Sequence, residues 1–198
     1  MILASHVILS AYGFWLPNEE RGSWSDFVRK WELHRFGNAT HVDTTRSVAH
    51  RPYDRQRKRE MRASLKYPAV KFTGQQALCI GNGFAEMVRK SNFKIYACAI
   101  LPDHVHLVIE RHSYSVEQVT NLLKGAATRK LTSSRLHPMN AVVTESEKLP
   151  SPWGVGLWKV FLDSPEDIER SIDYVERNPL KEGKPRQHWS FVKPYKHG

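Results

Sequence analysis

Two histidines separated by a single residue, His104 and His106, have a spacing that favours a chemical role. They lie in the run HVHLVIE, whose β-branched residues predict a strand over 104–110. Because side chains alternate along a strand, both imidazoles project from one face, roughly 7 Å apart. Two ring nitrogens on one face can share a metal ion. The alternative is a chance H-x-H tripeptide whose rings only hydrogen-bond their surroundings.

A tyrosine and an asparagine, Tyr174 and Asn178, form a second pair. They lie four residues apart in a predicted helix that begins after Ser164-Pro165 and is expected to stop at Asn178-Pro179, so they stack one turn apart. The expected core stripe of this helix is Ile168, Ile172 and Val175. Tyr174 and Asn178 lie off that stripe. The alternative is a half-buried tyrosine beside an Asn178 that merely caps the helix.

Chemistry can link the two pairs. A tyrosine hydroxyl is a poor nucleophile near neutral pH, because the ordinary pKa of a phenol is about 10. It can attack phosphorus if a cation neutralises the phosphate oxygens and holds the phosphate in line. Two imidazoles on a strand and an amide oxygen on the tyrosine's own helix would form a three-ligand site with open positions for phosphate oxygens.

The elements around these residues predict an α+β fold. Strands are expected over 5–11, 93–100, 104–110 and 156–163, and helices over 73–91, 115–134 and 164–177, with Thr73, Ser115 and Ser164 as caps. A basic helix is expected around 55–65. Without that region and the last helix, the order is β-α-β-β-α-β, which predicts a ferredoxin-like antiparallel sheet with packed helices and a C-terminal helix that carries the tyrosine.

The motifs LPDHVHLV and YVERNPLKEG, separated by a helix and the segment GLWKVFLDSPED, resemble the HUH single-tyrosine transposases. The REP-associated tyrosine transposases are the most similar group, and the resemblance covers about residues 74–185 and the first strand. It implies that His104 and His106 bind a catalytic divalent ion, that Asn178 is the third ligand and that Tyr174 is the nucleophile. Asp103 departs from the family, in which Asn is frequent at this position.

The resemblance also implies a reaction and its partners. Tyr174 would cleave single-stranded, hairpin-forming DNA through a 5′-phosphotyrosine link and free a 3′-hydroxyl, which allows strand transfer. The ion would be Mg²⁺ or Mn²⁺, and the protein would act as a monomer or a homodimer. The residues identify no general base for Tyr174. A nucleic-acid-binding module without catalysis and a nuclease that uses metal-activated water are the alternative functions.

The charge of the chain is consistent with a polyanionic partner. Its 198 residues carry a formal net charge of +10. The predicted DNA-binding residues are Lys124, Arg129, Lys130, Trp158 and Lys159. Because strand residues alternate, at most one of Trp158 and Lys159 faces the DNA. The three helix residues could equally form a solvated face.

The rest of the sequence predicts a single domain with a long basic insertion at about 12–72. Cys79 and Cys98 have neither metal-type nor redox spacing, so they are expected to be reduced core thiols. The apolar N-terminus lacks the basic start of a signal peptide, and no run is long enough for a membrane helix, so a cytoplasmic location without a membrane partner is expected.

Overall fold

The computed structural model describes residues 1–14, 55–142 and 148–196. The order of its elements agrees with the predicted order. The elements are β1 (Ala4–Ser10), α1 (Arg55–Ala63), α2 (Gly74–Ser91), β2 (Ile95–Ile100), β3 (His104–Glu110), α3 (Val116–Ser133), β4 (Trp158–Leu162) and α4 (Pro165–Lys181).

The four strands form one sheet in the order β2-β3-β1-β4, and every neighbouring pair is antiparallel. The first and last strands of the β-α-β-β-α-β unit therefore lie side by side. This order confirms the predicted ferredoxin-like α+β fold.

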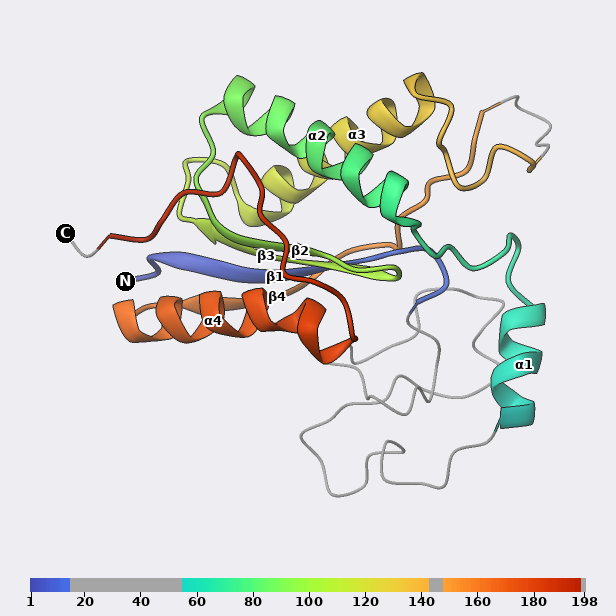
Figure 1. The fold of residues 1–198 in the computed structure, drawn as a ribbon, viewed down its shortest axis with the longest axis horizontal. Helices are drawn as coiled ribbons and strands as arrows, with labels where there is room; N and C mark the ends of the chain where they lie inside the picture. The colour runs from blue at the N-terminus through green and yellow to red at the C-terminus, as the bar shows by residue number, and fades with distance from the viewer. Residues whose placement is uncertain (15–54, 143–147, 197–198) are drawn as a thin grey trace.

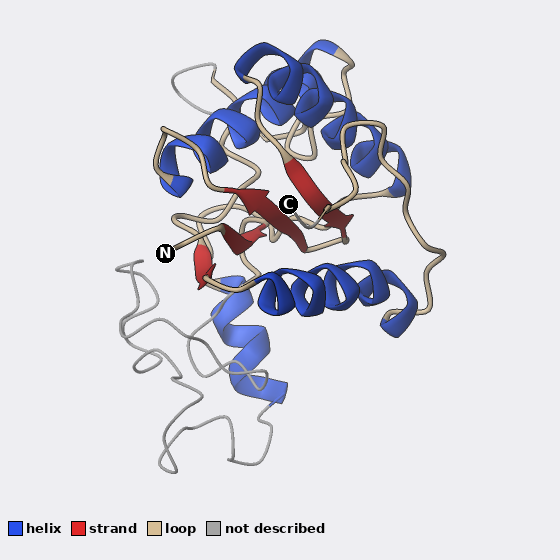
Figure 2. Cartoon of the chain, turned by 90° about the vertical axis from the view of Figure 1, so that its left-hand side faces the viewer, coloured by secondary structure: helices blue, strands red, loops and turns tan. Residues whose placement is uncertain are grey.

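Helices cover both faces of the sheet. Figures 1 and 2 show α2 and α3 packed together on one face and α4 lying along the other. Two buried clusters correspond to these two layers: Val7, Leu9 and Leu107 belong to the cluster beneath α2 and α3, whereas Val108 and Val175 belong to the cluster beneath α4. Alternate residues of β1 and β3 therefore point to different helix layers.

The predicted helix starts are confirmed. Thr73 and Ser115 each form a capping box with a glutamine three residues later, Gln76 and Gln118. The Ser164 side chain accepts a hydrogen bond from the backbone N–H of Asp167 at the start of α4, and Pro165 follows the cap.

The predicted end of α4 is wrong. The helix does not stop at Asn178-Pro179 but runs to Lys181, with Glu182 as its C-cap and Gly183 in the left-handed region (φ 67°) just beyond. Pro179 has no N–H to donate to the carbonyl four residues earlier, and its ring crowds that carbonyl, so it weakens the helix at this point. Pro179 is buried, so its packing offsets the lost hydrogen bond. Asn178 is consequently an internal helix residue, not a cap.

Other predictions concern the two cysteines, the insertion and membrane-spanning helices. Cys79 and Cys98 are both free and buried, as expected, and burial raises the pKa of the Cys98 thiol. The expected basic helix is present as α1, but residues 15–54 of the 12–72 insertion lie outside the described residues, so the single-domain arrangement stays a prediction. Among the described helices, none is long and apolar enough to cross a membrane.

Candidate active site

Pairing between β1 and β3 places three histidines on one face of the sheet. Ser10 is opposite His104 and Ile8 is opposite His106, while His6 is opposite Val108. Since Val108 belongs to the cluster beneath α4, alternation puts His6, His104 and His106 on that same face. The shared face of His104 and His106 follows the strand alternation expected from the sequence.

His6 is a site residue that the sequence reasoning missed. Its Nε2 lies 3.1 Å from Nδ1 of His106, and the two rings stack with centroids 5.3 Å apart. The ring of Trp158 stands edge-on to His6 at 5.4 Å. Alternation along β1 could have predicted that His6 lies on the other face of the sheet from Val7 and Leu9. Only the register between β1 and β3, however, places His6 beside His106.

His104 is oriented by the residue before it. Its Nδ1 lies 2.7 Å from a carboxylate oxygen of Asp103, and its ring stacks on Phe14 with centroids 4.8 Å apart. His104 is buried and its ring centroid lies 4.8 Å from that of His106. Asp103, which the sequence marked only as a departure from the frequent asparagine, therefore orients the His104 ring.

The environment keeps two of these imidazoles neutral. Burial lowers the pKa of His6 to about 4. Burial, together with the neighbouring His104, His6 and Lys181, lowers the pKa of His106 to about 2. At neutral pH both rings are therefore uncharged, which is the form of imidazole that binds a metal ion.

Tyr174 of α4 lies against the histidines in the same chain. Its ring centroid is 5.6 Å from that of His106 and 5.7 Å from that of His6, both edge-on. Tyr174 is 43% exposed, whereas Ile168 and Val175 of the same helix are buried beneath the sheet. The tyrosine ring thus lies at the rim of the site, where an external molecule can reach it.

Two further residues of α4 lie within two turns of Tyr174. Asn178 is buried, and its amide nitrogen approaches the Tyr174 carbonyl oxygen at 3.5 Å, which leaves the amide oxygen as a potential ligand atom. Lys181, which the sequence reasoning also missed, places Nζ 4.5 Å from the centre of the Tyr174 ring. Its position in the last turn depends on the continuation of α4 beyond Pro179.

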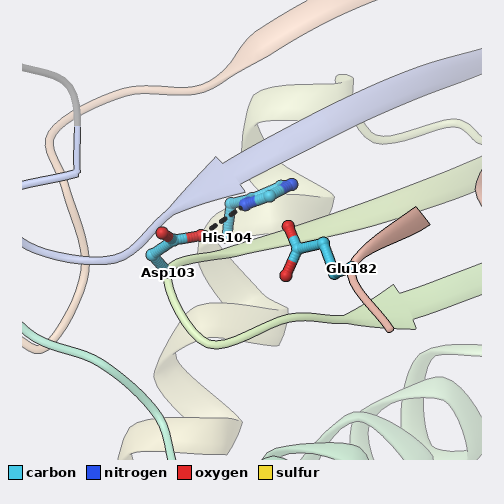
Figure 3. Close-up of side chains that lie close together, drawn as sticks. All are labelled: Asp103, His104 and Glu182. Atoms are coloured by element: carbon cyan, nitrogen blue, oxygen red, sulfur yellow. Dashed lines mark hydrogen bonds and ion pairs between the residues drawn. The ribbon is translucent and has the colours of Figure 1, made fainter. Parts of the chain in front are cut away.

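The donor set fits a divalent metal ion. Nδ1 of His104 is held by Asp103 and Nδ1 of His106 by His6, so each ring keeps Nε2 for a ligand. A second group overlaps with this one: Asp103, His104 and Glu182 each offer a ligand atom, and these atoms lie within 4.8 Å of one another. Figure 3 shows the carboxylates of Asp103 and Glu182 approaching the His104 ring from two sides.

The five predicted DNA-binding residues fall on different surfaces. Trp158 lies on the histidine face beside His6, whereas Lys159 points to the opposite face and pairs with Glu117 of α3. This agrees with the alternation expected for β4. Lys124 donates a hydrogen bond to the Gly156 carbonyl at 3.0 Å. Arg129 lines a pocket between α3 and the loop at 151–156, and Lys130 pairs with Glu86 of α2.

Residues 63–147 match the family described as Transposase IS200 like. The matched segment includes α2, β2, β3 with both strand histidines, and α3. The match confirms the predicted resemblance to these transposases over residues 63–147.

Two solved structures are similar to the chain at low sequence identity. One is a REP-associated tyrosine transposase bound to a REP hairpin, with 13% identity and a TM-score of 0.49; the match covers 96% of this chain and 76% of that one. The other is a candidate transposase from Deinococcus radiodurans R1, with 13% identity and a TM-score of 0.42, covering 89% and 91% of the two chains. No curated protein sequence matches the chain.

Proposed function

We propose that the protein cuts and rejoins single-stranded DNA through a covalent bond to Tyr174. The observation that carries this proposal is the approach of the Tyr174 ring to His106, with centroids 5.6 Å apart within one chain. A tyrosine that only stabilised the fold would gain most by burying its ring in the apolar cluster beneath α4. Tyr174 instead stays 43% exposed beside two neutral imidazoles.

The chain's own residues supply the nucleophile. The Tyr174 hydroxyl oxygen attacks phosphorus and forms a phosphotyrosine bond, while the bond from phosphorus to the 3′ oxygen breaks. The 3′ oxygen leaves as a hydroxyl by taking a proton, and the phenol proton passes to water. The energy of the phosphodiester is retained in the phosphotyrosine bond, so a 3′-hydroxyl from another strand can reverse the reaction and join the DNA.

His104, His106 and Asn178 are the residues that would hold Mg²⁺ or Mn²⁺. When bound, the ion would neutralise the non-bridging phosphate oxygens and orient the phosphate. Asp103 and His6 contact the Nδ1 atoms of the two histidines, which leaves both Nε2 atoms for the ion. Asn178 adds a neutral oxygen ligand from the same helix as the nucleophile.

The surroundings of Tyr174 suit an unpaired nucleic acid strand. Lys181 places a positive charge beside the Tyr174 ring, close enough to contact a phosphate held there. Trp158 lies on the same face, where its ring can stack on a base. We propose a single-stranded region of hairpin DNA as the substrate, with one chain sufficient to assemble the site.

A covalent-adduct assay tests the proposal. The protein is incubated with Mn²⁺ and a panel of single-stranded hairpin oligonucleotides labelled at the 3′ end, then denatured and separated by electrophoresis. The intact protein should retain the label covalently, and Tyr174→Phe should not, because it lacks the attacking oxygen. Tyr114→Phe is a matched control, since Tyr114 is also exposed but lies outside the site.

The products separate the alternative functions. A nuclease that activates water would release free 5′-phosphate ends and keep its activity in Tyr174→Phe. A module that only binds would retain DNA affinity without cleavage in either protein. Either result would exclude Tyr174 as the nucleophile.

A further inference from the structure

We infer that Glu182 is a further ligand of the divalent ion and binds it together with His104, an inference that rests on the proposed function. Glu182 is the C-cap of α4, in the part of the helix that extends beyond Pro179. One ligand atom from each of Asp103, His104 and Glu182 lies within 4.8 Å of the others, and the Glu182 carboxylate is directed toward the His104 ring in Figure 3.

The two carboxylates of this group have different roles. Asp103 lies 2.7 Å from Nδ1 of His104, so that nitrogen carries the proton and the lone pair remains on Nε2. Asp103 is therefore a positioning residue, and Glu182 supplies the second ligand atom. A ring nitrogen of His104 and a carboxylate oxygen of Glu182 lie within 4.8 Å of each other, a separation at which two side chains can bind the same ion.

The helix geometry supports a ligand role rather than a role as base. Tyr174, Asn178 and Glu182 recur every four residues and so follow one side of α4 toward the site. Glu182 is one turn from Asn178, but it is about 12 Å along the axis from Tyr174, given a rise of about 1.5 Å per residue. This separation along the helix favours a contact of Glu182 with the ion over direct transfer of the Tyr174 proton.

A carboxylate would also supply the negative charge that the other three ligands lack. Two imidazoles and one amide bring no negative charge to a doubly charged ion, whereas Mg²⁺ and Mn²⁺ prefer anionic oxygen ligands. Glu182 would supply this charge, so the ion can bind before DNA arrives. Its present partner is Lys184, whose Nζ lies 3.9 Å from Oε2. Both side chains are partly exposed, so that weak contact can be replaced at little cost.

A Mn²⁺ titration of the intact protein without DNA tests the inference. Free Mn²⁺ is measured by electron paramagnetic resonance, which requires no catalysis. Glu182→Gln removes the charge but keeps the size of the side chain, so Mn²⁺ affinity should fall about tenfold or more. Glu182→Asp should restore part of the affinity. Glu176→Gln, which removes an exposed carboxylate from the same helix, should bind Mn²⁺ as the unmodified protein does. Thermal unfolding of each variant without metal verifies that the fold is retained.

The outcomes distinguish this inference from the proposed function. If His104→Ala abolishes Mn²⁺ binding and Glu182→Gln leaves it unchanged, Glu182 is not a ligand and the proposed function stands. If the unmodified protein binds no Mn²⁺ without DNA, the inference is overturned, while the adduct assay judges the proposed function separately. If Glu182→Gln weakens binding but no adduct forms on any DNA, the ligand assignment stands and the proposed reaction is rejected.

Discussion

The side chains of His6 and His106 meet through Nε2 and Nδ1 at 3.1 Å, although they lie 100 residues apart in the chain. This contact joins the first strand to the strand that carries the two predicted metal ligands. For His106 to present the lone pair of Nε2 to an ion, its Nδ1 must carry the proton and donate it to His6. We therefore expect His6 to accept this proton and to favour the tautomer of His106 that leaves Nε2 for an ion.

Replacing His6 should weaken the metal site while the rest of the site remains. His6→Phe keeps an aromatic ring beside Trp158 and Tyr174 but removes the acceptor for His106, so Mn²⁺ affinity should fall about 10- to 100-fold. His6→Gln, whose amide oxygen can accept the same hydrogen bond, should recover much of that loss. Mn²⁺ titrations of the two variants provide the measurement. Equal affinities for His6→Phe and the unmodified protein would contradict a positioning role.

Removing the positive charge at Lys181 should slow DNA cleavage. Its ammonium group lies 4.5 Å from the centre of the Tyr174 ring, where it can stabilise a phosphate approached by the tyrosine. We expect Lys181→Met to lower the rate of adduct formation about tenfold. Lys181→Arg should keep most of the rate, and Lys90→Met, an exposed lysine at the end of α2, serves as the control. Equal loss in the Lys90 and Lys181 variants would indicate general electrostatic attraction to DNA instead.

Gly83 should be essential for the close packing of α2 on α3. A Cβ atom at this position would lie 2.8 Å from Cα of Ala127 and 3.0 Å from backbone atoms of Ala126. Those atoms belong to helix backbone and cannot rotate away, so overpacking should cost about 1–3 kcal/mol. Alanine has a better helix propensity than glycine, but this stabilises the helix by only about 1 kcal/mol. Gly83→Ala should therefore lower the free energy of unfolding in urea.

Gly74 provides the matched control for this change. It opens the same helix, but a Cβ atom there would meet nothing within 4 Å. Gly74→Ala should leave the free energy of unfolding unchanged or raise it by up to about 1 kcal/mol. A similar loss of stability in both variants would mean that helix contact at Gly83 is not the cause.

His137 should make the fold sensitive to acid. The residue is buried, its Nδ1 accepts a hydrogen bond from the Met139 N–H at 3.2 Å, and its Nε2 has no hydrogen-bond partner among the described residues. Burial lowers the pKa of His137 in the folded state below the value of about 6.5 expected when the chain is unfolded. The unfolded chain therefore binds the proton more readily. The neutral, buried His137 therefore makes its full contribution to stability above about pH 6.5. This contribution is lost as the pH falls toward the pKa of His137 in the folded state.

A comparison with His137→Asn isolates this effect, because the asparagine oxygen can accept the Met139 hydrogen bond but does not titrate in this range. Urea unfolding at several pH values between 8 and 5, chosen to span the expected transition, should show the unmodified protein losing stability relative to the variant on acidification. Parallel pH curves for the two proteins would refute the assignment.

The sequence by itself determined those parts of the site that depend on local periodicity. Alternation along β3 placed His104 and His106 on one face, and the helical repeat placed Tyr174 and Asn178 on one side of α4. The capping boxes at Thr73 and Ser115 were also readable, because a cap depends on residues only three positions apart.

Only the tertiary structure decided which distant residues join that site. The register between β1 and β3 brought His6 to His106, and no local pattern specifies the pairing of strands so far apart. Because the buried Pro179 packs within the fold, α4 continues one turn further than expected for a helix that meets a proline. This continuation places Lys181 beside Tyr174 and Glu182 near His104. Helix and strand periods arise between neighbours in the chain, whereas register and burial arise between segments that meet only after folding.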